Sequence, residues 1–469
     1  MCHTIEIDGH CDEEFEAVRR AFKKNFKCGW EDEGAAFAVY YKGKLVVDLW
    51  GGYADKSCLR PWTEDTLSVV FSTTKSVTAI CIAMLIDRGF LDYDDYIVKH
   101  WPEFGKHGKE MITLKMVLSH KAGLIHFGEP VSMEHLTDRS KMSTLIENMR
   151  PVHEPGAKTA YHVVNYGWIL DQLCSRVDPL NRSISEFFKQ EIAQKHNIDF
   201  HIGLPTNHLY RMARLKKYKC CDAVIEAICN PMVAVIGAFF LSPIGFFSEV
   251  KKDVKCAGQD FTMFNNPALT QLEMPAANGV STARDLAKIH HLLIDLDLPK
   301  GQENSEKLLS SELINQISEP TNNFKEFDHT IGNWYNKEYG FMYTKSPMGT
   351  WQLGHLGVGG QNVKTDFKNQ LTFAYLTNGL ETDDLMDEGV TDADGHFRLS
   401  GKETEFTSID PKLNVYHDCN DENTPCLKKF SIMIPDTFIT EGEHPDKVFD
   451  AGKIELAGTF SGESRDCLN

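Results

Sequence analysis

A serine and a lysine three residues apart could together carry out nucleophilic chemistry. The segment Ser72–Lys75, with the sequence STTK, leads into an apolar run, Thr78–Ile86, that predicts a buried helix. Positions i and i+3 of a helix share a face, so the Lys75 amine is expected beside the Ser72 hydroxyl. A serine hydroxyl is a weak nucleophile until a base takes its proton, and a desolvated lysine can be that base. The spacing therefore predicts an acyl-transfer nucleophile.

The Ser-x-x-Lys spacing alone is not specific. It occurs by chance in many chains of this length, and the alternative is a capping serine followed one turn later by a solvated lysine. The apolar segment Leu67–Phe71 before it and the buried helix after it favour the chemical interpretation. A helix N-terminus also offers free backbone N–H groups that can stabilise an oxyanion.

The elements that must position this serine are predicted at both ends of the first 380 residues. A helix is expected over Asp12–Lys27, and strands are expected near the start and the end of this region. The expected strands are Phe37–Tyr41, Lys44–Trp50, Gly340–Tyr343, Trp351–Gly357 and Leu371–Asn378. Helical, loop-rich sequence fills the middle. One antiparallel sheet assembled from both ends, with a helical insertion, is an α+β layout.

Further motifs accompany Ser72–Lys75 along the chain. They are Trp50–Asp55, Leu118–Leu124, Pro155-Gly156, Tyr161-His162, Ala276–Gly279, Gly354–Gly360 and Phe373–Asn378. In order and spacing they resemble the beta-lactamase-related serine hydrolases, which include class C beta-lactamases, penicillin-binding proteins and esterases. Animal beta-lactamase domain-containing proteins look most similar. Over roughly residues 10–380 the resemblance implies a beta-lactamase/transpeptidase-like fold, with an antiparallel sheet flanked by helices and a largely helical subdomain.

The resemblance implies three catalytic residues. Ser72 is the acylated nucleophile and Lys75 is the base beside it. Tyr161 matches the tyrosine of the second family motif, which passes a proton to the leaving group and takes one from the deacylating water.

The resemblance also implies a substrate-binding and oxyanion group. His355 and Gly357 stand where beta-lactamases commonly have Lys-Thr-Gly and many relatives have His-x-Gly. Val358 is expected to supply one oxyanion N–H group and Ser72 the other. Losing one such donor typically costs about 3–4 kcal/mol in kcat.

Two departures from the family pattern bear on the substrate. Val163 stands where the second motif normally has an asparagine that binds the side-chain amide of a beta-lactam. His355, in place of a lysine, should hold a substrate carboxylate less firmly. Both favour hydrolysis of a small ester or amide over efficient beta-lactam hydrolysis. The alternative is a non-catalytic scaffold or assembly protein that keeps the fold.

Composition limits the partners and the compartment. A net charge of −18 argues against nucleic acid, because phosphate binding needs an excess of Lys and Arg. The pair His290-His291 lacks the i+4 spacing and glutamate of a zinc site, and no motif indicates a cofactor or metal. The 13 cysteines are odd in number and the N-terminus lacks a signal-peptide pattern, so free thiols in a cytoplasmic enzyme are expected. The oligomeric state stays open.

One uncharged segment of 17 residues, 231–247, could suggest a membrane. It is shorter than the about 20 apolar residues that a helical span needs, and Pro243 and Gly245 interrupt it. A buried core segment or a lid over the active site is the favoured interpretation. Contact with a membrane surface is the alternative.

The C-terminal part differs in composition from the rest. Residues 380–469 contain about 21 acidic and about 8 basic side chains. Residues 1–380 are predicted to form the hydrolase domain, and residues 381–469 an acidic extension of unknown role. Alternating apolar positions in Phe430–Ile434 and Val448–Phe460 could form strands, so part of 429–460 is expected to pack on the body while Glu381–Asp394 stays a linker.

Overall fold

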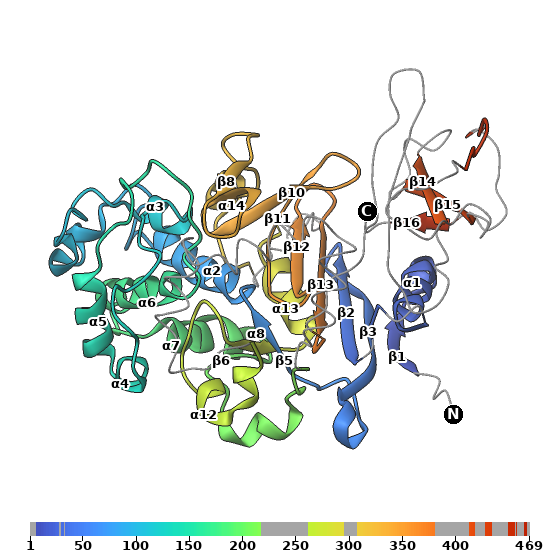
Figure 1. Ribbon diagram of the computed structural model, residues 1–469, viewed down its shortest axis with the longest axis horizontal. Helices are drawn as coiled ribbons and strands as arrows, with labels where there is room; N and C mark the ends of the chain where they lie inside the picture. Colours follow the sequence, from blue (N-terminus) through green and yellow to red (C-terminus); the bar gives the residue numbers. More distant parts are fainter. Residues whose placement is uncertain are drawn as a thin grey trace, which may run out of the picture.

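Strands from both ends of the first 380 residues form one central sheet in the computed structural model (Figure 1). The structure describes residues 6–27, 30–31, 33–216, 261–294, 307–379, 412–417, 427–433, 449–454, 456 and 464–466. Neighbouring strands of the central sheet are antiparallel, in the order β1-β3-β2-β13-β12-β11-β10-β9-β8. The predicted α+β layout is therefore confirmed.

The strands of the central sheet cover the five predicted segments. In chain order they are β1 (Ile7–Cys11), β2 (Gly34–Tyr41), β3 (Lys44–Asp55), β8 (Glu326–Asp328), β9 (Asn333–Glu338), β10 (Phe341–Lys345), β11 (Trp351–Leu356), β12 (Asn362–Asp366) and β13 (Leu371–Thr377), and the short β4 (Arg60–Pro61) pairs with β3. The Lys42-Gly43 turn joins β2 to β3, as the hairpin pattern predicts.

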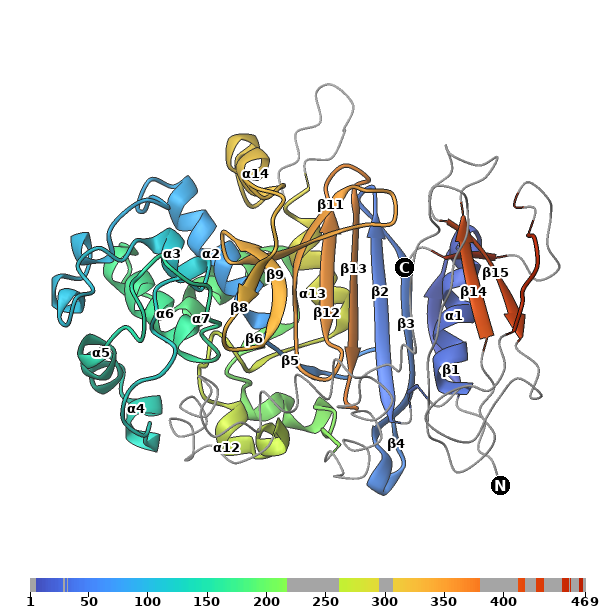
Figure 2. The ribbon, with the colours of Figure 1, turned by 45° about the horizontal axis from the view of Figure 1, so that its top comes forward.

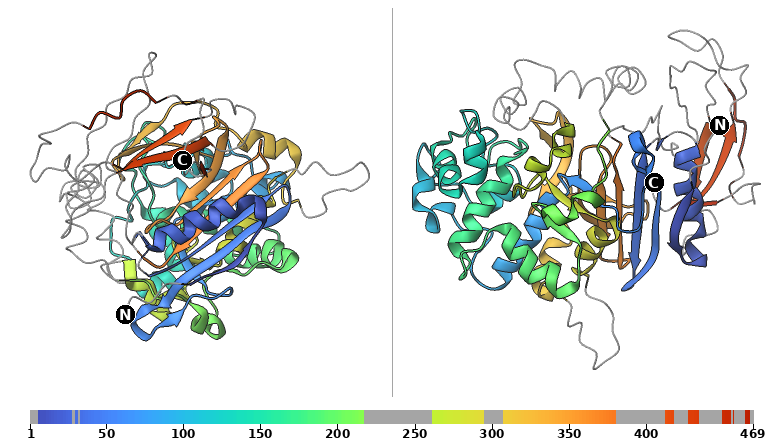
Figure 3. Two further views of the ribbon diagram at one scale, coloured as in Figure 1. Left: turned by 90° about the vertical axis from the view of Figure 1, so that its right-hand side faces the viewer. Right: turned by 90° about the horizontal axis from the view of Figure 1, so that it is seen from below.

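Both faces of the central sheet are covered, and β2 shows why. Its residues alternate between the two faces, with Ala36 and Ala38 in the main core and Phe37 and Val39 in a second apolar cluster. On the second face lies helix α1 (Glu16–Lys27), whose Phe22 and Phe26 belong to the same cluster. The left view of Figure 3 shows α1 crossing this face.

Two helices lie on the opposite face of the central sheet. α13 (Ala283–His291) contacts β2, β12 and β13, and α2 (Thr74–Asp87) contacts β10 and β11. In α2 every residue from Thr74 to Leu85 is buried, so the helix is surrounded by protein on all sides, as its apolar composition predicts. This burial places the lysine of the Ser-x-x-Lys motif in the interior.

Shorter helices gather beyond α2 and form a lobe at one end of the sheet (Figures 1 and 2). They are α3 (Leu114–Leu118), α4 (Met133–Thr137), α5 (Arg139–Asn148), α6 (Asn165–Val177), α7 (Ile184–Phe188) and α8 (Gln194–His196). Two more, α12 (Pro267–Thr270) and α14 (Ser311–Ile317), lie later in the chain. This lobe is the predicted helical subdomain, and α6 packs directly on α2.

A small second sheet leads into the Ser-x-x-Lys helix. It has the order β5-β7-β6, with β5 (Ser68–Phe71), β7 (Gly279–Ser281) and β6 (Phe200–Ile202). β5 ends immediately before Ser72, so this sheet fixes where the polypeptide turns into α2.

The C-terminal part forms a third sheet, beside α1 (Figure 2). Its order is β14-β15-β16, with β14 (Lys412–His417), β15 (Leu427–Met433) and β16 (Ser464–Asp466). β15 covers most of the strand predicted at 430–434. The second predicted strand is wrong for residues 449–454 and 456, which have no strand conformation. β16 contacts α1, so residues 464–466 lie against the body. Most of 429–460 lies outside the described residues, so the packing predicted for that range stays a prediction.

Segments 231–247 and 381–394 lie outside the described residues, so the predictions made for them stay predictions. Among the helices that are described, none has the length and apolar character to cross a membrane. The four cysteines of the described part, Cys11, Cys58, Cys81 and Cys174, are free thiols.

Candidate active site

Ser72 lies in the turn between β5 and α2. The helix begins at Thr74, two residues later than predicted, but the Lys75 N–H donates to the Ser72 carbonyl at 3.0 Å and keeps the two residues one turn apart. Phe71 has a φ of 45°, which is unfavourable for a residue with a Cβ atom. The Thr74 hydroxyl donates to the Phe71 carbonyl at 2.5 Å and accepts the Gly279 N–H at 2.9 Å. These bonds hold the turn that presents Ser72.

The Lys75 amine is fully enclosed and has three partners. Its Nζ lies 3.3 Å from Ser72 Oγ, 2.7 Å from the Val163 carbonyl oxygen and 2.8 Å from the Ala276 carbonyl oxygen. Burial, together with the positive charge of Lys337, lowers the pKa of Lys75 well below its usual range. A neutral amine has two N–H bonds, which match the two carbonyls, and one lone pair, which then faces the Ser72 hydroxyl. The geometry is that of a base beside a nucleophile.

Tyr161 completes this group from the loop before α6. Its hydroxyl hydrogen-bonds Ser72, and the Lys75 Nζ lies 4.7 Å from its ring centroid. Burial raises the pKa of Tyr161 above its usual range, and the hydrogen bond with Ser72 offsets this only in part. The hydroxyl therefore keeps its proton at neutral pH and can donate it.

Three buried histidines surround the tyrosine. The His120 ring lies 4.5 Å from the Tyr161 ring and accepts the His162 backbone N–H at Nδ1 over 3.2 Å. The His355 ring lies 6.1 Å from Tyr161, and its Nδ1 donates to the Leu356 carbonyl at 2.6 Å. Burial lowers the pKa of His120 well below its usual range and lowers the pKa of His162 and of His355 to about 3. All three rings are neutral at physiological pH, so His355 offers a substrate carboxylate no positive charge.

Gly357 and Val358 follow β11 and lie at the end of β5. A Cβ atom at Gly357 would be 2.6 Å from the Val70 carbonyl oxygen, so only glycine allows the two segments to come this close. The Gly357 N–H donates to Gln361 at 2.7 Å. Within the described residues, the backbone N–H groups of Ser72 and Val358 donate to no other residue.

The structure brings all six predicted site residues to the junction of β5, α2, β11 and the loop before α6. It adds two that no sequence motif indicated, Lys337 on β9 and Asp328 at the end of β8. They form a buried ion pair, and the Lys337 Nζ lies 5.1 Å from the Tyr161 ring centroid. The segment Asn333–Glu338 carries no motif that indicates what it faces, so only the tertiary structure reveals the pair.

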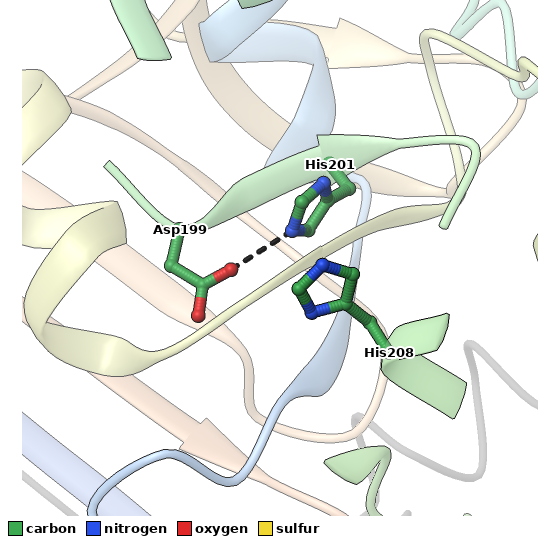
Figure 4. A group of neighbouring side chains, drawn as sticks. All are labelled: Asp199, His201 and His208. Atoms are coloured by element: carbon green, nitrogen blue, oxygen red, sulfur yellow. Dashed lines mark hydrogen bonds and ion pairs between the residues drawn. The ribbon is translucent and has the colours of Figure 1, made fainter. Parts of the chain in front are cut away.

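A second cluster, also missed by the sequence motifs, lies on the small sheet beside β6. Asp199, His201 and His208 have ligand atoms within 4.8 Å of one another (Figure 4). His201 Nε2 lies 2.8 Å from Asp199 Oδ1, and the rings of His201 and His208 are 5.0 Å apart. One carboxylate and two imidazoles are donor types that zinc accepts.

Arg211 decides how this second cluster is interpreted. Its guanidinium donates to the free oxygen of Asp199 and lies 3.1 Å from His208 Nδ1. A metal ion would have to displace this cation from both groups. The chain therefore supplies its own counter-charge for Asp199, and we interpret the cluster as an ion-pair network that ties β6 to the turn at residues 206–211.

Comparisons with known proteins match most of the chain to one family. Residues 22–394 match the beta-lactamase family. The esterase/beta-lactamase LipL of Mycobacterium tuberculosis is 31% identical over 378 residues, which cover 80% of this chain and 83% of the relative. The crystal structure of a family VIII carboxylesterase superimposes with a TM-score of 0.67 at 30% identity, covering 81% of this chain and 95% of the other.

The C-terminal part matches a different family. Residues 365–435 match the transthyretin-like family. Transthyretin-like protein 5 of Caenorhabditis elegans is 55% identical over 91 residues, which are 19% of this chain and 66% of the relative. The two family matches overlap at 365–394, where β13 belongs to the central sheet. The sequence motifs gave no indication of this second family.

Proposed function

This chain belongs to the beta-lactamase family of serine hydrolases, with a C-terminal part of the transthyretin-like family, and we propose that it cleaves small esters or amides through an acyl-enzyme on Ser72. Its activity is esterase-like rather than that of an efficient beta-lactamase. Residues 1–380 form the hydrolase domain, and residues 381–469 form the extension.

The observation that carries this proposal is the position of the Lys75 amine. It lies 3.3 Å from Ser72 Oγ, fully buried, with two N–H bonds directed to carbonyl oxygens. Lys75 takes the Ser72 proton as the oxygen attacks the substrate carbonyl, and the N–H groups of Ser72 and Val358 stabilise the oxyanion. A scaffold has no need of a desolvated amine at this position.

Tyr161 supplies the second proton transfer. The raised pKa of its hydroxyl makes it a donor, so it protonates the leaving group and regains a proton from Lys75. Water then attacks the acyl-enzyme, gives its proton back through Tyr161 and Lys75, and releases the acid and free Ser72. Acylation thus carries the Ser72 proton to the leaving group, and deacylation returns a proton from water to Ser72, so the enzyme regains its starting protonation only after both half-reactions.

Two features support an ester or small amide as the substrate. Val163 contributes only its backbone carbonyl to the site, to Lys75, and its side chain packs against the core. The buried His355 is neutral, so neither residue provides the amide-binding or carboxylate-binding group that beta-lactam recognition uses in relatives. An uncharged acyl group fits this site best.

Labelling with a fluorophosphonate probe, followed by mass mapping of the modified residue, tests the proposal. We expect one adduct, on Ser72, because a fluorophosphonate reacts with a serine whose oxygen is activated by a base. A Ser72→Ala variant should lose the adduct, and a Ser140→Ala variant, which changes an exposed serine on α5, should keep it. An unlabelled wild-type protein, or an adduct on another serine, would favour the non-catalytic scaffold instead.

A further inference from the structure

Lys337 and Asp328 form an ion pair that is almost completely excluded from solvent. Their side chains are 2% and 0% exposed. Besides its contact with Asp328, the Lys337 Nζ lies 5.1 Å from the Tyr161 ring centroid and 5.0 Å from that of Tyr335. Burying two charges costs several kcal/mol before their attraction is counted, and apolar residues often replace such pairs without loss of stability. Stability alone therefore does not explain the pair.

The carboxylate of Asp328 binds the backbone that carries the catalytic tyrosine. Its Oδ1 accepts the N–H groups of Tyr161 at 3.1 Å, Thr330 at 2.9 Å and Ile331 at 2.9 Å, and its Oδ2 accepts from Lys337. The same hairpin holds Thr159, whose carbonyl accepts an N–H at 2.9 Å from the residue after Asp328. The position of Tyr161 is thus fixed from the β8–β9 hairpin.

We propose that Lys337 and Asp328 are positioning residues for the reaction at Ser72: Asp328 fixes the backbone of Tyr161, and Lys337 holds a positive charge beside the Tyr161 ring, which Lys75 also contacts. The proposal rests on the proposed function, since it assigns these residues to the same site. Neither residue touches the reacting atoms.

The position of Lys337 matters because of which groups face Lys75. From the elements packed around it come His120, Tyr161, His162, Tyr166 on α6, His355 on β11, and Tyr335, Lys337 and Asp328 from the β8–β9 hairpin. In this set Asp328 is the carboxylate, and Lys337 neutralises it. Burial is the main cause of the low pKa of Lys75, and the Lys337 charge is the second. Because Lys337 neutralises the Asp328 carboxylate, this carboxylate does not raise the pKa of Lys75, and the Lys75 amine stays neutral.

The two members of the pair should act on the base in opposite directions. Lys337→Met removes a positive charge and exposes Lys75 to the Asp328 anion, so the pKa of Lys75 rises and the acid limb of the kcat/KM profile moves to higher pH. Asp328→Asn keeps an acceptor for the Tyr161 N–H but removes the anion, so the limb moves to lower pH. Each shift should be on the order of one pH unit.

The test measures kcat/KM for p-nitrophenyl butyrate and the rate of fluorophosphonate labelling, both across pH. Lys121→Met is the matched control, because Lys121 pairs with Glu326 on the same hairpin at 2.6 Å but the pair is partly exposed rather than buried. The control should keep the wild-type profile, and Lys337→Arg, which keeps the charge, should return close to it.

Shifts of opposite sign in Lys337→Met and Asp328→Asn support the proposal. Shifts of the same sign, or a Lys121→Met shift as large as that of Lys337→Met, overturn it and leave the hairpin a merely structural role. Should Asp328→Asn fail to fold, the comparison of Lys337→Met with Lys337→Arg decides: equal profiles overturn the proposal. Failure of the proposed function looks different, because the wild-type protein would then not be labelled at Ser72.

Discussion

Two clusters of this molecule contain similar residue types but differ in chemistry. Around Ser72 and Lys75 the basic groups are buried, and the carboxylate that the described residues place among them, Asp328, is already paired. Around Asp199 the side chains are partly exposed, and the carboxylate lies at the centre, bound by His201 and Arg211. In the first cluster, burial lowers the pKa of the basic groups, so they are neutral. In the second cluster, the Asp199 carboxylate accepts hydrogen bonds from His201 and Arg211.

The contrast shows that residue type alone does not make a catalytic site. Partial burial would raise the pKa of Asp199, but the hydrogen bonds from His201 and Arg211 outweigh it and lower the pKa to about 2. Lys75 has no carboxylate partner of its own among the bonds in the described structure and keeps a lone pair toward Ser72. Under the proposed function, a free lone pair beside Ser72 in a dry site distinguishes this cluster from the structural cluster around Asp199.

The largest effect that separates the clusters is expected from single alanine variants. Ser72→Ala should fold normally and lose nearly all turnover of short p-nitrophenyl esters, since removing the nucleophile of a well-studied serine protease costs about a millionfold in kcat. His208→Ala, in the second cluster, should leave turnover within about twofold of wild type, because that cluster takes no part in the reaction. Steady-state kinetics measures both. A Ser72→Ala enzyme within about tenfold of wild type would refute the nucleophile.

A smaller effect concerns the substrate of the reactive cluster. We expect kcat/KM for p-nitrophenyl butyrate to exceed that for nitrocefin by at least about 100-fold, a difference of roughly 2.7 kcal/mol. The reason is that Val163 offers no side-chain hydrogen bond to a beta-lactam amide. Val163→Asn should reduce this difference by raising kcat/KM for nitrocefin. Comparable constants in the wild-type enzyme contradict the esterase assignment, and a Val163→Asn variant without any gain on nitrocefin removes Val163 as its cause.

The smallest effect concerns stability in the second cluster. Asp199→Asn should cost about 1 kcal/mol of unfolding free energy at pH 7, well under the roughly 2.6 kcal/mol that a comparable pKa shift yields for an isolated group, because the site is partly exposed. The folded pKa of Asp199 is depressed to about 2, so its contribution is present above the unfolded value near about 4 and is lost as the pH falls toward about 2. Urea unfolding at several pH values measures this. A cost that grows on acidification would have the wrong sign.

Much of the fold was predictable because its patterns are local. The apolar-rich segments Phe37–Tyr41 and Lys44–Trp50 flank a Lys-Gly turn, a local hairpin pattern, and the all-round apolar character of Thr78–Ile86 indicates a buried helix. The strand predicted within 448–460 is wrong for residues 449–454 and 456, because an alternating pattern makes a strand only where packing and pairing partners support it. The transthyretin-like character of the C-terminal part was missed because its short strands carry no reactive motif.

The sequence by itself determined which residues could react. The spacing of Ser72 and Lys75, and the glycine that must follow His355, are local properties of the chain, and all of them lie together in the structure. Only the tertiary structure decided the protonation states of that group. The pKa of Lys75 depends on complete burial and on Lys337, and the position of Tyr161 depends on Asp328, both far along the chain. Burial and long-range charge arise only when distant segments pack, so no local pattern can encode them.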